Sequence, residues 1–173
     1  MELFNYYCST SSDINEHLST LAEYASRCDS VCEMGVRKCV STWAFVHGLQ
    51  NGASLTSIDI KHPSFYDGDI SQVERACKEK HIDFKFIEAD TTKIEIDSVD
   101  FLFIDTLHTY DQLKKELELH GNKSNKYLAF HDTVSCETEL MPAIHEFMRE
   151  NPHWIERAHY KNNNGVLILE RVW

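Results

Sequence analysis

Two apolar runs in this sequence end in residues that can do chemistry. The first, FLFIDTLHTY, passes from an apolar stretch to Asp105 and then to His108. The second, YLAFHD, ends in His131 and Asp132. A carboxylate beside an imidazole can bind a metal ion, move a proton or orient a substrate. These two stretches are therefore the strongest indication of function, and the elements around them must bring them together.

The overall composition narrows the classes of protein that this chain can be. It has 173 residues, enough for a core of its own, and we take 1–173 as a single domain. The formal net charge of −11 argues against nucleic acid as a partner, because phosphate contacts need Lys and Arg. No apolar run approaches the roughly 20 residues that span a bilayer, and no basic start precedes an apolar stretch. We expect a cytoplasmic protein with no membrane partner.

Cysteines are the other composition signal. The six are Cys8, Cys28, Cys32, Cys39, Cys77 and Cys136, and none forms a CxxC pair. In a chain without a secretion signal we expect reduced thiols. Packing of small side chains in the core is the favoured interpretation, and a zinc site built from these thiols is the minor alternative.

The spacing of apolar residues predicts alternating strands and helices. Helical spacing is found over 11–27, where Asp13 and Glu16 resemble a capping box, and again at 38–51, 69–80, 110–120 and 137–151. Strand patterns lie between them, at 30–35, 54–60, 83–90, 98–105 and 126–132. The apolar run before Asp105 indicates a strand that is buried on both faces. Two last strands, 154–160 and 165–172, flank an Asn-Gly turn and predict an antiparallel hairpin.

This order predicts an α/β fold with a Rossmann-like, doubly wound, mostly parallel seven-stranded sheet and a terminal antiparallel hairpin. Residues 1–28 would form an N-terminal helical segment of the same domain. Such sheets bind ligands beyond the carboxyl ends of their strands, where the strand order reverses. Each of the first five strands ends in or next to an acid: Glu33, Asp59, Asp90, Asp105 and Asp132. We therefore expect these acids to line one edge of the sheet.

The loop after the first strand, EMGVRKCVST, should lie against a cofactor. It has one glycine, Gly35, and lacks the GxGxxG pattern that brings the backbone close to a pyrophosphate. A cofactor without phosphate has less need of that pattern. S-adenosylmethionine (SAM) carries no phosphate, and acidic residues suit its sulfonium cation and its ribose hydroxyls.

With these motifs the sequence resembles the class I SAM-dependent methyltransferases over nearly its whole length. More narrowly, it resembles the small O-methyltransferases that include macrocin-type sugar O-methyltransferases and relatives of cephalosporin hydroxylase. That group shows E-x-G-x-x-x-G-x-S-T, I-D-G-x-H-x-Y and H-D, which read EMGVRKCVST, IDTLHTY and HD here. Cys39 and Thr106 stand where the group has glycine. A Cβ at residue 39 is expected to narrow the loop or to shift the start of the following helix.

The resemblance implies a set of residues that bind the cofactor: Glu33, Gly35, Ser41, Asp59, Ile60, Asp90, Thr91 and Asp105. The first three would lie near the methionine end of SAM, where the start of a helix favours its carboxylate. Asp59 would accept hydrogen bonds from the ribose hydroxyls. Asp90 would meet the adenine edge together with Thr91. For Asp59 and Asp90, a strand-end turn or a helix cap is the structural alternative.

Related metal-dependent O-methyltransferases imply a further role for the fourth and fifth strand ends. Asp105 and Asp132 would share a divalent cation such as Mg²⁺, and His131 would add a nitrogen ligand that better suits a transition metal. The cation would lower the pKa of an acceptor hydroxyl. The predicted catalytic residues are His108, His131 and Asp105. His108 is the first choice for general base, because an imidazole titrates near neutrality, and a capping or packing histidine is its structural alternative.

Together these inferences predict a SAM-dependent O-methyltransferase that acts on a hydroxyl of a small molecule or saccharide. Two alternatives stay open. One is an NAD-dependent oxidoreductase on a similar sheet, against which the missing phosphate loop counts. The other is a non-catalytic cofactor-binding or assembly protein, which Cys39 and the short chain favour. Residues 1–28 leave the pocket rather open, so a homodimer is one way to close it.

Overall fold

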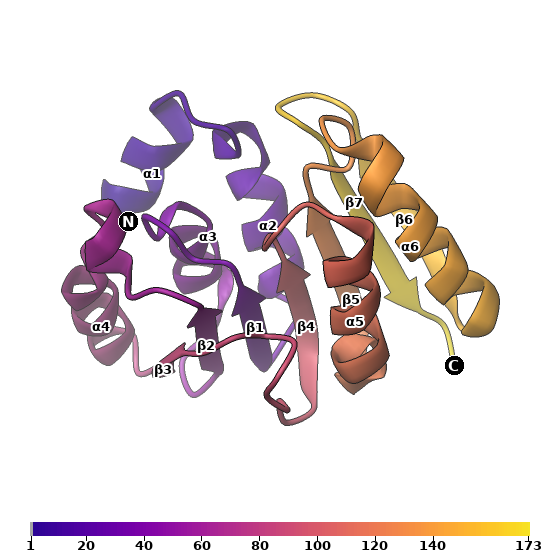
Figure 1. The fold of residues 1–173 in the computed structure, drawn as a ribbon. Coiled ribbons are helices and arrows are strands. Elements are labelled where there is room, and N and C mark those ends of the chain that lie inside the picture. The colour runs from indigo at the N-terminus through magenta and orange to yellow at the C-terminus, as the bar shows by residue number, and fades with distance from the viewer. Residues whose placement is uncertain (1) are drawn as a thin grey trace.

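The computed structural model of the protein describes residues 2–173, in which seven strands form one sheet. The strand order is β3-β2-β1-β4-β5-β7-β6 (Figure 1). The strands are β1 Ser30–Met34, β2 Ser54–Asp59, β3 Asp83–Glu88, β4 Val99–Ile104, β5 Ser124–His131, β6 Trp154–Tyr160 and β7 Val166–Arg171. Strands β1 to β5 pair in parallel, and β7 pairs antiparallel with both β5 and β6. The predicted fold class is confirmed. Residue 1 of the predicted domain lies outside the described residues.

Helices cover both faces of the sheet, as its order requires. One face carries α2 Leu18–Ala25, α3 Val40–Gly48 and α4 Ile70–Glu79, and α1 Glu2–Ser9 packs against α3. The other face carries α5 Tyr110–His120 and α6 Glu137–Glu150. Figure 1 shows α5 and α6 in front of the sheet. Three short 3-10 turns complete the chain: η1 Asn15–His17, η2 Pro63–Tyr66 and η3 Gly121–Lys123.

Strand β4 shows how the sequence places the core. Its side chains alternate, so Phe101 and Phe103 pack under α2 and α3 while Leu102 and Ile104 pack under α5 and α6. All four are at most 4% exposed. Because β4 lies at the centre of a sheet covered on both faces, its four consecutive residues from Phe101 to Ile104 are all apolar. The abrupt change to Asp105 therefore marks the place where the strand leaves the core.

The N-terminal segment differs from the sequence-based expectation. Helix α1 was not predicted as a separate element, and the helix expected from residue 11 begins at Leu18, after η1. The capping box predicted from Asp13 and Glu16 is wrong. The Asp13 carboxylate pairs with Arg37, and the Glu16 backbone N–H donates to the side chain of Asn163. Distant tertiary partners thus take the groups that a local cap would use.

The helix expected over 38–51 begins two residues later, at Val40. Cys39 is the cause, because it has φ 65° and ψ 25° and cannot continue an α-helix. The Cys39 side chain is buried in the core under α3, and the effect of its Cβ on the loop and on the helix start stays a prediction.

None of the helices formed by residues 2–173 combines the length and the apolar character that crossing a membrane requires.

Candidate cofactor and metal site

The carboxyl ends of the parallel strands meet at one edge of the sheet, where two neighbouring cavities lie. The strand-end cavity, of about 390 Å³, includes six predicted cofactor residues in its lining: Gly35, Asp59, Ile60, Asp90, Thr91 and Asp105. The N-terminal cavity, of about 560 Å³, lies between the first loop and residues 6–14 and is lined by Ser41 among others. Gly35, Arg37 and Asp105 line both. The fold therefore brings most of the predicted residues to one place.

Gly35 sits where the ends of two strands come closest. Its backbone has φ +88°, and a Cβ at this position would lie 1.8 Å from the carbonyl oxygen of Asp105. The Gly35 N–H donates to Ile58 O at 2.9 Å, and the Asp105 N–H donates to Met34 O at 2.8 Å. Only glycine fits at this close contact, where the first loop packs against the start of the loop after β4.

Asp59 holds the first loop in place from the end of β2. Its Oδ2 accepts hydrogen bonds from the backbone N–H groups of Val36 at 2.8 Å and Arg37 at 2.9 Å. Its Oδ1 accepts from the Lys61 N–H at 3.0 Å. The strand-end turn named as an alternative for Asp59 is thus present, and the same carboxylate also lines the strand-end cavity. Ile60 beside it is 61% exposed, an apolar surface on the cavity wall.

Glu33 lies beneath the loop and outside both cavities. It is fully buried, and its carboxylate accepts hydrogen bonds from the hydroxyls of Ser41 at 2.5 Å, Thr42 at 2.8 Å and Ser57 at 2.7 Å. Burial raises the pKa of Glu33 to about 7, although the three hydroxyls oppose the shift. Because Glu33 is buried outside both cavities, its position does not favour direct contact with a cofactor. That contact stays a prediction from the sequence. Ser41 reaches the N-terminal cavity, but its hydroxyl hydrogen is directed to Glu33.

Asp90 closes a turn after β3 and also lines the strand-end cavity. Its Oδ1 accepts from the N–H of Thr92 at 3.0 Å and from its hydroxyl at 2.6 Å, and its Oδ2 pairs with Lys93 at 2.8 Å. Lys93, followed by the bonds from Thr92, lowers the pKa of Asp90 to about 2. The strand-end turn named as an alternative for Asp90 is therefore observed, and its carboxylate lines the strand-end cavity as well.

Sequence reasoning missed Glu116, which supports the far wall of the strand-end cavity from α5. It is fully buried and binds three cavity-lining residues: Thr91 through its hydroxyl at 2.5 Å, Thr106 through its hydroxyl at 2.8 Å and Gln112 through its amide at 2.8 Å. Burial raises the pKa of Glu116. The signal was present in the sequence, since Glu116 falls on the apolar face of α5 beside Leu113 and Leu117.

Asp105, His108, His131 and Asp132 form a compact charged cluster at the ends of β4 and β5. His108 Nε2 lies 3.2 Å from Asp105 Oδ1 and 3.0 Å from Asp132 Oδ2. His131 Nδ1 lies 3.4 Å from Asp105 Oδ2 and 3.1 Å from Asp132 Oδ2. The sequence-based expectation that the two strand ends meet is therefore confirmed.

The two carboxylates and two imidazoles shift one another's pKa values. Burial opposes the charged form of Asp105, but the two neighbouring histidines outweigh burial and lower its pKa to about 2. Burial likewise disfavours protonated His131, but Asp105 and Asp132 raise its pKa to about 10. The hydrogen bond to Asp105 raises the pKa of His108. Both shifts favour the protonated form of the imidazoles, and a general base must be unprotonated, so the base roles predicted for His108 and His131 stay predictions.

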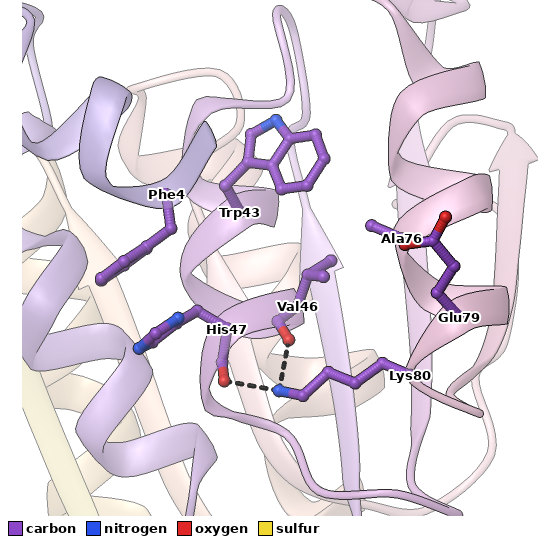
Figure 2. Close-up of a pocket in the computed structure, with 7 residues that line it drawn as sticks. All are labelled: Phe4, Trp43, Val46, His47, Ala76, Glu79 and Lys80. Atoms are coloured by element: carbon purple, nitrogen blue, oxygen red, sulfur yellow. Dashed lines mark hydrogen bonds between the residues drawn. The ribbon is translucent and has the colours of Figure 1, made fainter. Parts of the chain in front are cut away.

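A third cavity, of about 280 Å³, lies away from the strand ends between α1, α3 and α4 (Figure 2). Phe4 stacks on His47 with ring centroids 3.9 Å apart, and Lys80 donates to the last carbonyls of α3, Val46 O at 2.8 Å and His47 O at 2.6 Å. None of the predicted site residues lines this cavity, whereas most of the predicted cofactor residues line the other two. We interpret this cavity as a gap in the packing between the helices, where Lys80 caps the C-terminal end of α3.

Comparison with solved structures identifies the fold. An O-methyltransferase from Bacillus cereus in complex with S-adenosylhomocysteine (SAH) superposes with TM-score 0.66 at 15% identity, covering 98% of this chain and 89% of that one. TomG from Streptomyces achromogenes, an O-methyltransferase of tomaymycin synthesis in complex with SAM, gives TM-score 0.67 at 12% identity, covering 100% and 91%. SAH-bound PaMTH1 from Podospora anserina gives 0.64 at 12%, covering 98% and 86%.

The chain has the class I methyltransferase fold. No family model matches the sequence, and a search of curated proteins finds no match. At 12–15% sequence identity, these similarities establish the fold alone. Within this methyltransferase fold, Asp59 and Asp105 line the cavities at the strand ends, and Asp132 lies next to Asp105 through the shared His108.

Proposed function

We propose that the protein is a SAM-dependent O-methyltransferase acting on a hydroxyl of a small molecule or saccharide. The observation that carries this proposal is the strand-end cavity, which joins the acid of β2 to the acid of β4 across Gly35 in a methyltransferase fold. The finer resemblance to macrocin-type enzymes and cephalosporin hydroxylase relatives is part of the same proposal. It is supported by IDTLHTY and HD, whose Asp105, His108 and Asp132 converge in space.

Different residues of this chain would bind different parts of the cofactor. The ribose and adenine would occupy the strand-end cavity, where Asp59 offers an acceptor oxygen, Ile60 an apolar surface and Asp90 a second acceptor. The amino-acid end would lie over Gly35, with the Asp105 carboxylate suited to its ammonium group. When bound, SAM supplies an electrophilic methyl group on its sulfonium. The chain mainly aligns the acceptor oxygen with that group, an effect worth up to about 7–11 kcal/mol.

The charged cluster fits a divalent cation. Asp105, His131 and Asp132 each offer a ligand atom, and these atoms lie within 4.8 Å of one another. His131 Nδ1 is buried and makes no well-formed hydrogen bond within residues 2–173. Asp105, His131 and Asp132 would hold the ion, which would lower the pKa of a bound hydroxyl and orient it.

The acceptor would enter from the N-terminal cavity. Its wall carries hydroxyl and aromatic groups from Tyr6, Tyr7 and Ser11, which are suited to a hydroxylated substrate. Arg37 pairs with Asp13 across this cavity at 2.9 Å, so residues 10–14 already cover part of it. A homodimer that completes the cover remains part of the proposal, with neither nucleic acid nor a membrane as partner.

Calorimetric titration with SAH and, separately, with NAD tests this function. SAH should bind and NAD should not. Asp59→Ala should weaken SAH binding by about tenfold or more, because a charged hydrogen bond is worth roughly 1.5–3 kcal/mol. The exposed Asp97→Ala is the matched control and should bind SAH as the wild type does.

The two alternatives correspond to the other outcomes of this titration. NAD binding would place the protein among the oxidoreductases. SAH binding without methyl transfer to any of a panel of phenolic and saccharide acceptors would favour a non-catalytic protein. Absence of SAH binding would contradict the proposal outright, and Cys39 in the first loop would then be the first residue to examine.

A further inference from the structure

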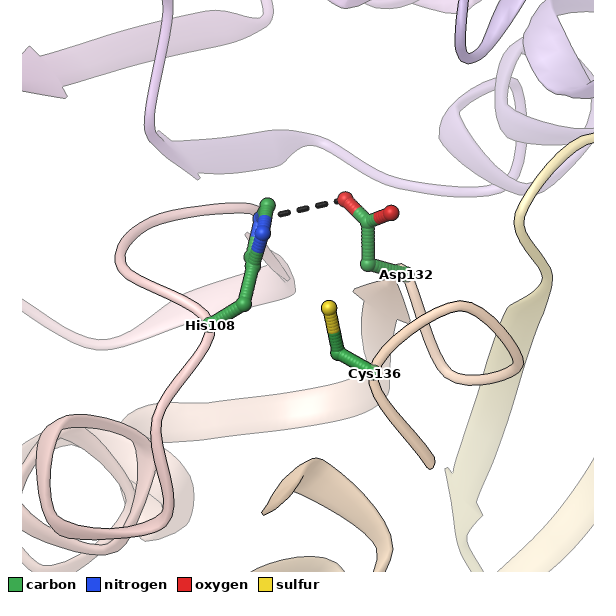
Figure 3. A group of neighbouring side chains, drawn as sticks. All are labelled: His108, Asp132 and Cys136. Atoms are coloured by element: carbon green, nitrogen blue, oxygen red, sulfur yellow. Dashed lines mark ion pairs between the residues drawn. The ribbon is translucent and has the colours of Figure 1, made fainter. Parts of the chain in front are cut away.

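Five potential metal ligands surround the end of β5, and one of them is a thiol. Asp132 ends the strand, His108 comes from the loop before α5, and Cys136 immediately precedes α6. One ligand atom from each of these three lies within 4.8 Å of the other two. Figure 3 shows the three side chains pointing toward one another. Asp132 also belongs to the group formed with Asp105 and His131, so the two groups meet at one carboxylate.

His131 provides an independent indication that a ligand belongs here. Its side chain is 1% exposed, and Nδ1 has no hydrogen-bond partner among residues 2–173 although two carboxylate oxygens lie 3.1 and 3.4 Å away. Those oxygens are close enough but are misaligned for a hydrogen bond. His131 Nε2 lies 3.0 Å from Asp13 O and 3.3 Å from Asn163 O. Since carbonyl oxygens only accept, Nε2 carries a hydrogen, and the Nδ1 lone pair of a neutral ring is free for a metal.

The spacing of the donor atoms matches the coordination sphere of a small ion. Metal–nitrogen and metal–oxygen bonds of about 2.0–2.1 Å place neighbouring ligand atoms roughly 3.0 Å apart in an octahedron and about 3.4 Å apart in a tetrahedron. The four His–Asp distances in the cluster are 3.0, 3.1, 3.2 and 3.4 Å. The two histidines and two aspartates could therefore bind an ion with little movement, and the Cys136 ligand atom lies within 4.8 Å of those of His108 and Asp132.

The chemistry of the donors favours one class of metal. Mg²⁺ prefers oxygen ligands and retains several waters. Imidazole and thiolate ligands instead suit borderline ions such as Zn²⁺ and Co²⁺. We propose that this cluster binds a transition-metal ion of the zinc class rather than Mg²⁺, with His108 and the thiolate of Cys136 joining Asp132, Asp105 and His131 as its ligands.

This proposal concerns the same site as the proposed methyl transfer, but metal binding does not require that activity. It assigns His108 as a ligand in place of the general base predicted from the sequence. It also gives Cys136 a specific function, whereas composition favoured core packing for all six cysteines. Cys136 is only partly buried, and among residues 2–173 the only hydrogen bond to its thiol is a weak one from Ser135 Oγ at 3.9 Å.

Cobalt binding to the reduced, metal-free full chain tests the assignment. Co²⁺ should produce visible ligand-field bands together with a near-ultraviolet thiolate-to-cobalt charge-transfer band. Zn²⁺ should abolish both, and millimolar Mg²⁺ should leave both unchanged. Cys136→Ser should remove the charge-transfer band and weaken Zn²⁺ binding by about 10-fold or more, since even outer partners of a metal site are worth roughly 10–100-fold. Cys8→Ser on α1, also partly buried, is the matched control and should keep the wild-type spectrum.

Three results would overturn the proposal: no charge-transfer band in the wild type, an unchanged band in Cys136→Ser, or displacement of Co²⁺ by Mg²⁺. His108→Gln is a second variant, on the exposed side of the cluster, and should weaken Zn²⁺ binding by a similar factor. Far-ultraviolet circular dichroism shows that each variant is folded. SAH titration of the same samples separates this proposal from the proposed function, because either ligand can bind when the other does not.

Discussion

The backbone at Gly35 leaves no room for a side chain. An added Cβ would lie 1.8 Å from Asp105 O, and the backbone must also keep a φ of +88°. We expect Gly35→Ala to lower the free energy of unfolding by about 2–4 kcal/mol, because the loop and the end of β4 must separate. Urea denaturation measures this loss.

Gly52 provides the matched control for Gly35. It has nearly the same φ, +87°, but an added Cβ would meet nothing within 4 Å. Gly52→Ala therefore carries only the conformational strain, about 1–2 kcal/mol. Equal losses of unfolding free energy in the two variants would show that the close approach of Gly35 to Asp105 contributes nothing to the cost of Gly35→Ala.

Buried Glu33 should make stability depend on pH. Its pKa is raised to about 7 in the folded protein, chiefly by burial, above an unfolded value near 4.3. The folded state therefore binds a proton more readily, and the contribution of Glu33 to stability is greatest below about pH 4.3 and is lost as pH rises through about 7. We expect Glu33→Gln to reduce the fall in the free energy of unfolding between pH 5 and 7.5. Thermal melts across this range measure the effect.

The control for Glu33 is Glu23→Gln, whose carboxylate is exposed and pairs with Arg27 nearby on the surface. Its pH dependence should match that of the wild type. A Glu33→Gln profile parallel to the wild-type profile would contradict the role that burial gives to Glu33.

At the scale of elements, the sequence predicts the sheet better than the segments that are held by distant contacts. The strands could be predicted because alternation and burial act locally, as in β4, and the Asn-Gly step marked the hairpin. The convergence of Asp105 and Asp132 followed from topology alone. Helix η1 and the start of α2 could not be predicted, because Asp13 and Glu16 bind residues far along the chain. Glu116 was missed because an acid on an apolar helix face has no local signature for its partners.

Helix α5 connects two loops of the strand-end cavity through Glu116. Its carboxylate binds Thr91 after β3 and Thr106 after β4. We expect Glu116→Ala to lower the free energy of unfolding by about 2–4 kcal/mol, because the buried Thr91 hydroxyl and the partly buried Thr106 hydroxyl lose their acceptor. SAH affinity should fall as well, since both threonines line the cavity. Denaturation and calorimetry measure the two effects.

Glu118 lies on the same helix and is the control for Glu116. It is exposed and pairs with Lys115 at 3.6 Å, so Glu118→Ala should change stability by less than about 0.5 kcal/mol. If Glu116→Ala lowered the free energy of unfolding as little as Glu118→Ala, the hydrogen bonds between Glu116 and the two loops would not contribute to stability.

At the scale of the whole molecule, the beginning and the end of the chain meet above the site. The turn between β6 and β7 contains Asn163, whose side chain accepts from the Glu16 N–H at 3.1 Å and donates to Ser12 O at 2.9 Å. The backbone carbonyl of Asn163 faces His17 at 3.2 Å and His131 at 3.3 Å. The same N-terminal segment lines the N-terminal cavity through residues 10–14. The antiparallel hairpin thus does more than finish the sheet, because it holds the cover of the acceptor side.

This arrangement predicts that Asn163→Gly frees the N-terminal segment without unfolding the sheet. Glycine tolerates the positive φ of 43° at this position, so the main loss is that of two hydrogen bonds to residues 12–16. Amide hydrogen exchange over 10–17 should become about tenfold faster, while exchange in β4 and β5 stays unchanged. Asn164→Gly removes a neighbouring side chain with φ 69° and a single contact of 3.5 Å, so it should alter exchange far less. Equal exchange in the two variants would mean that packing against the core, and not the Asn163 side chain, keeps this segment over the site.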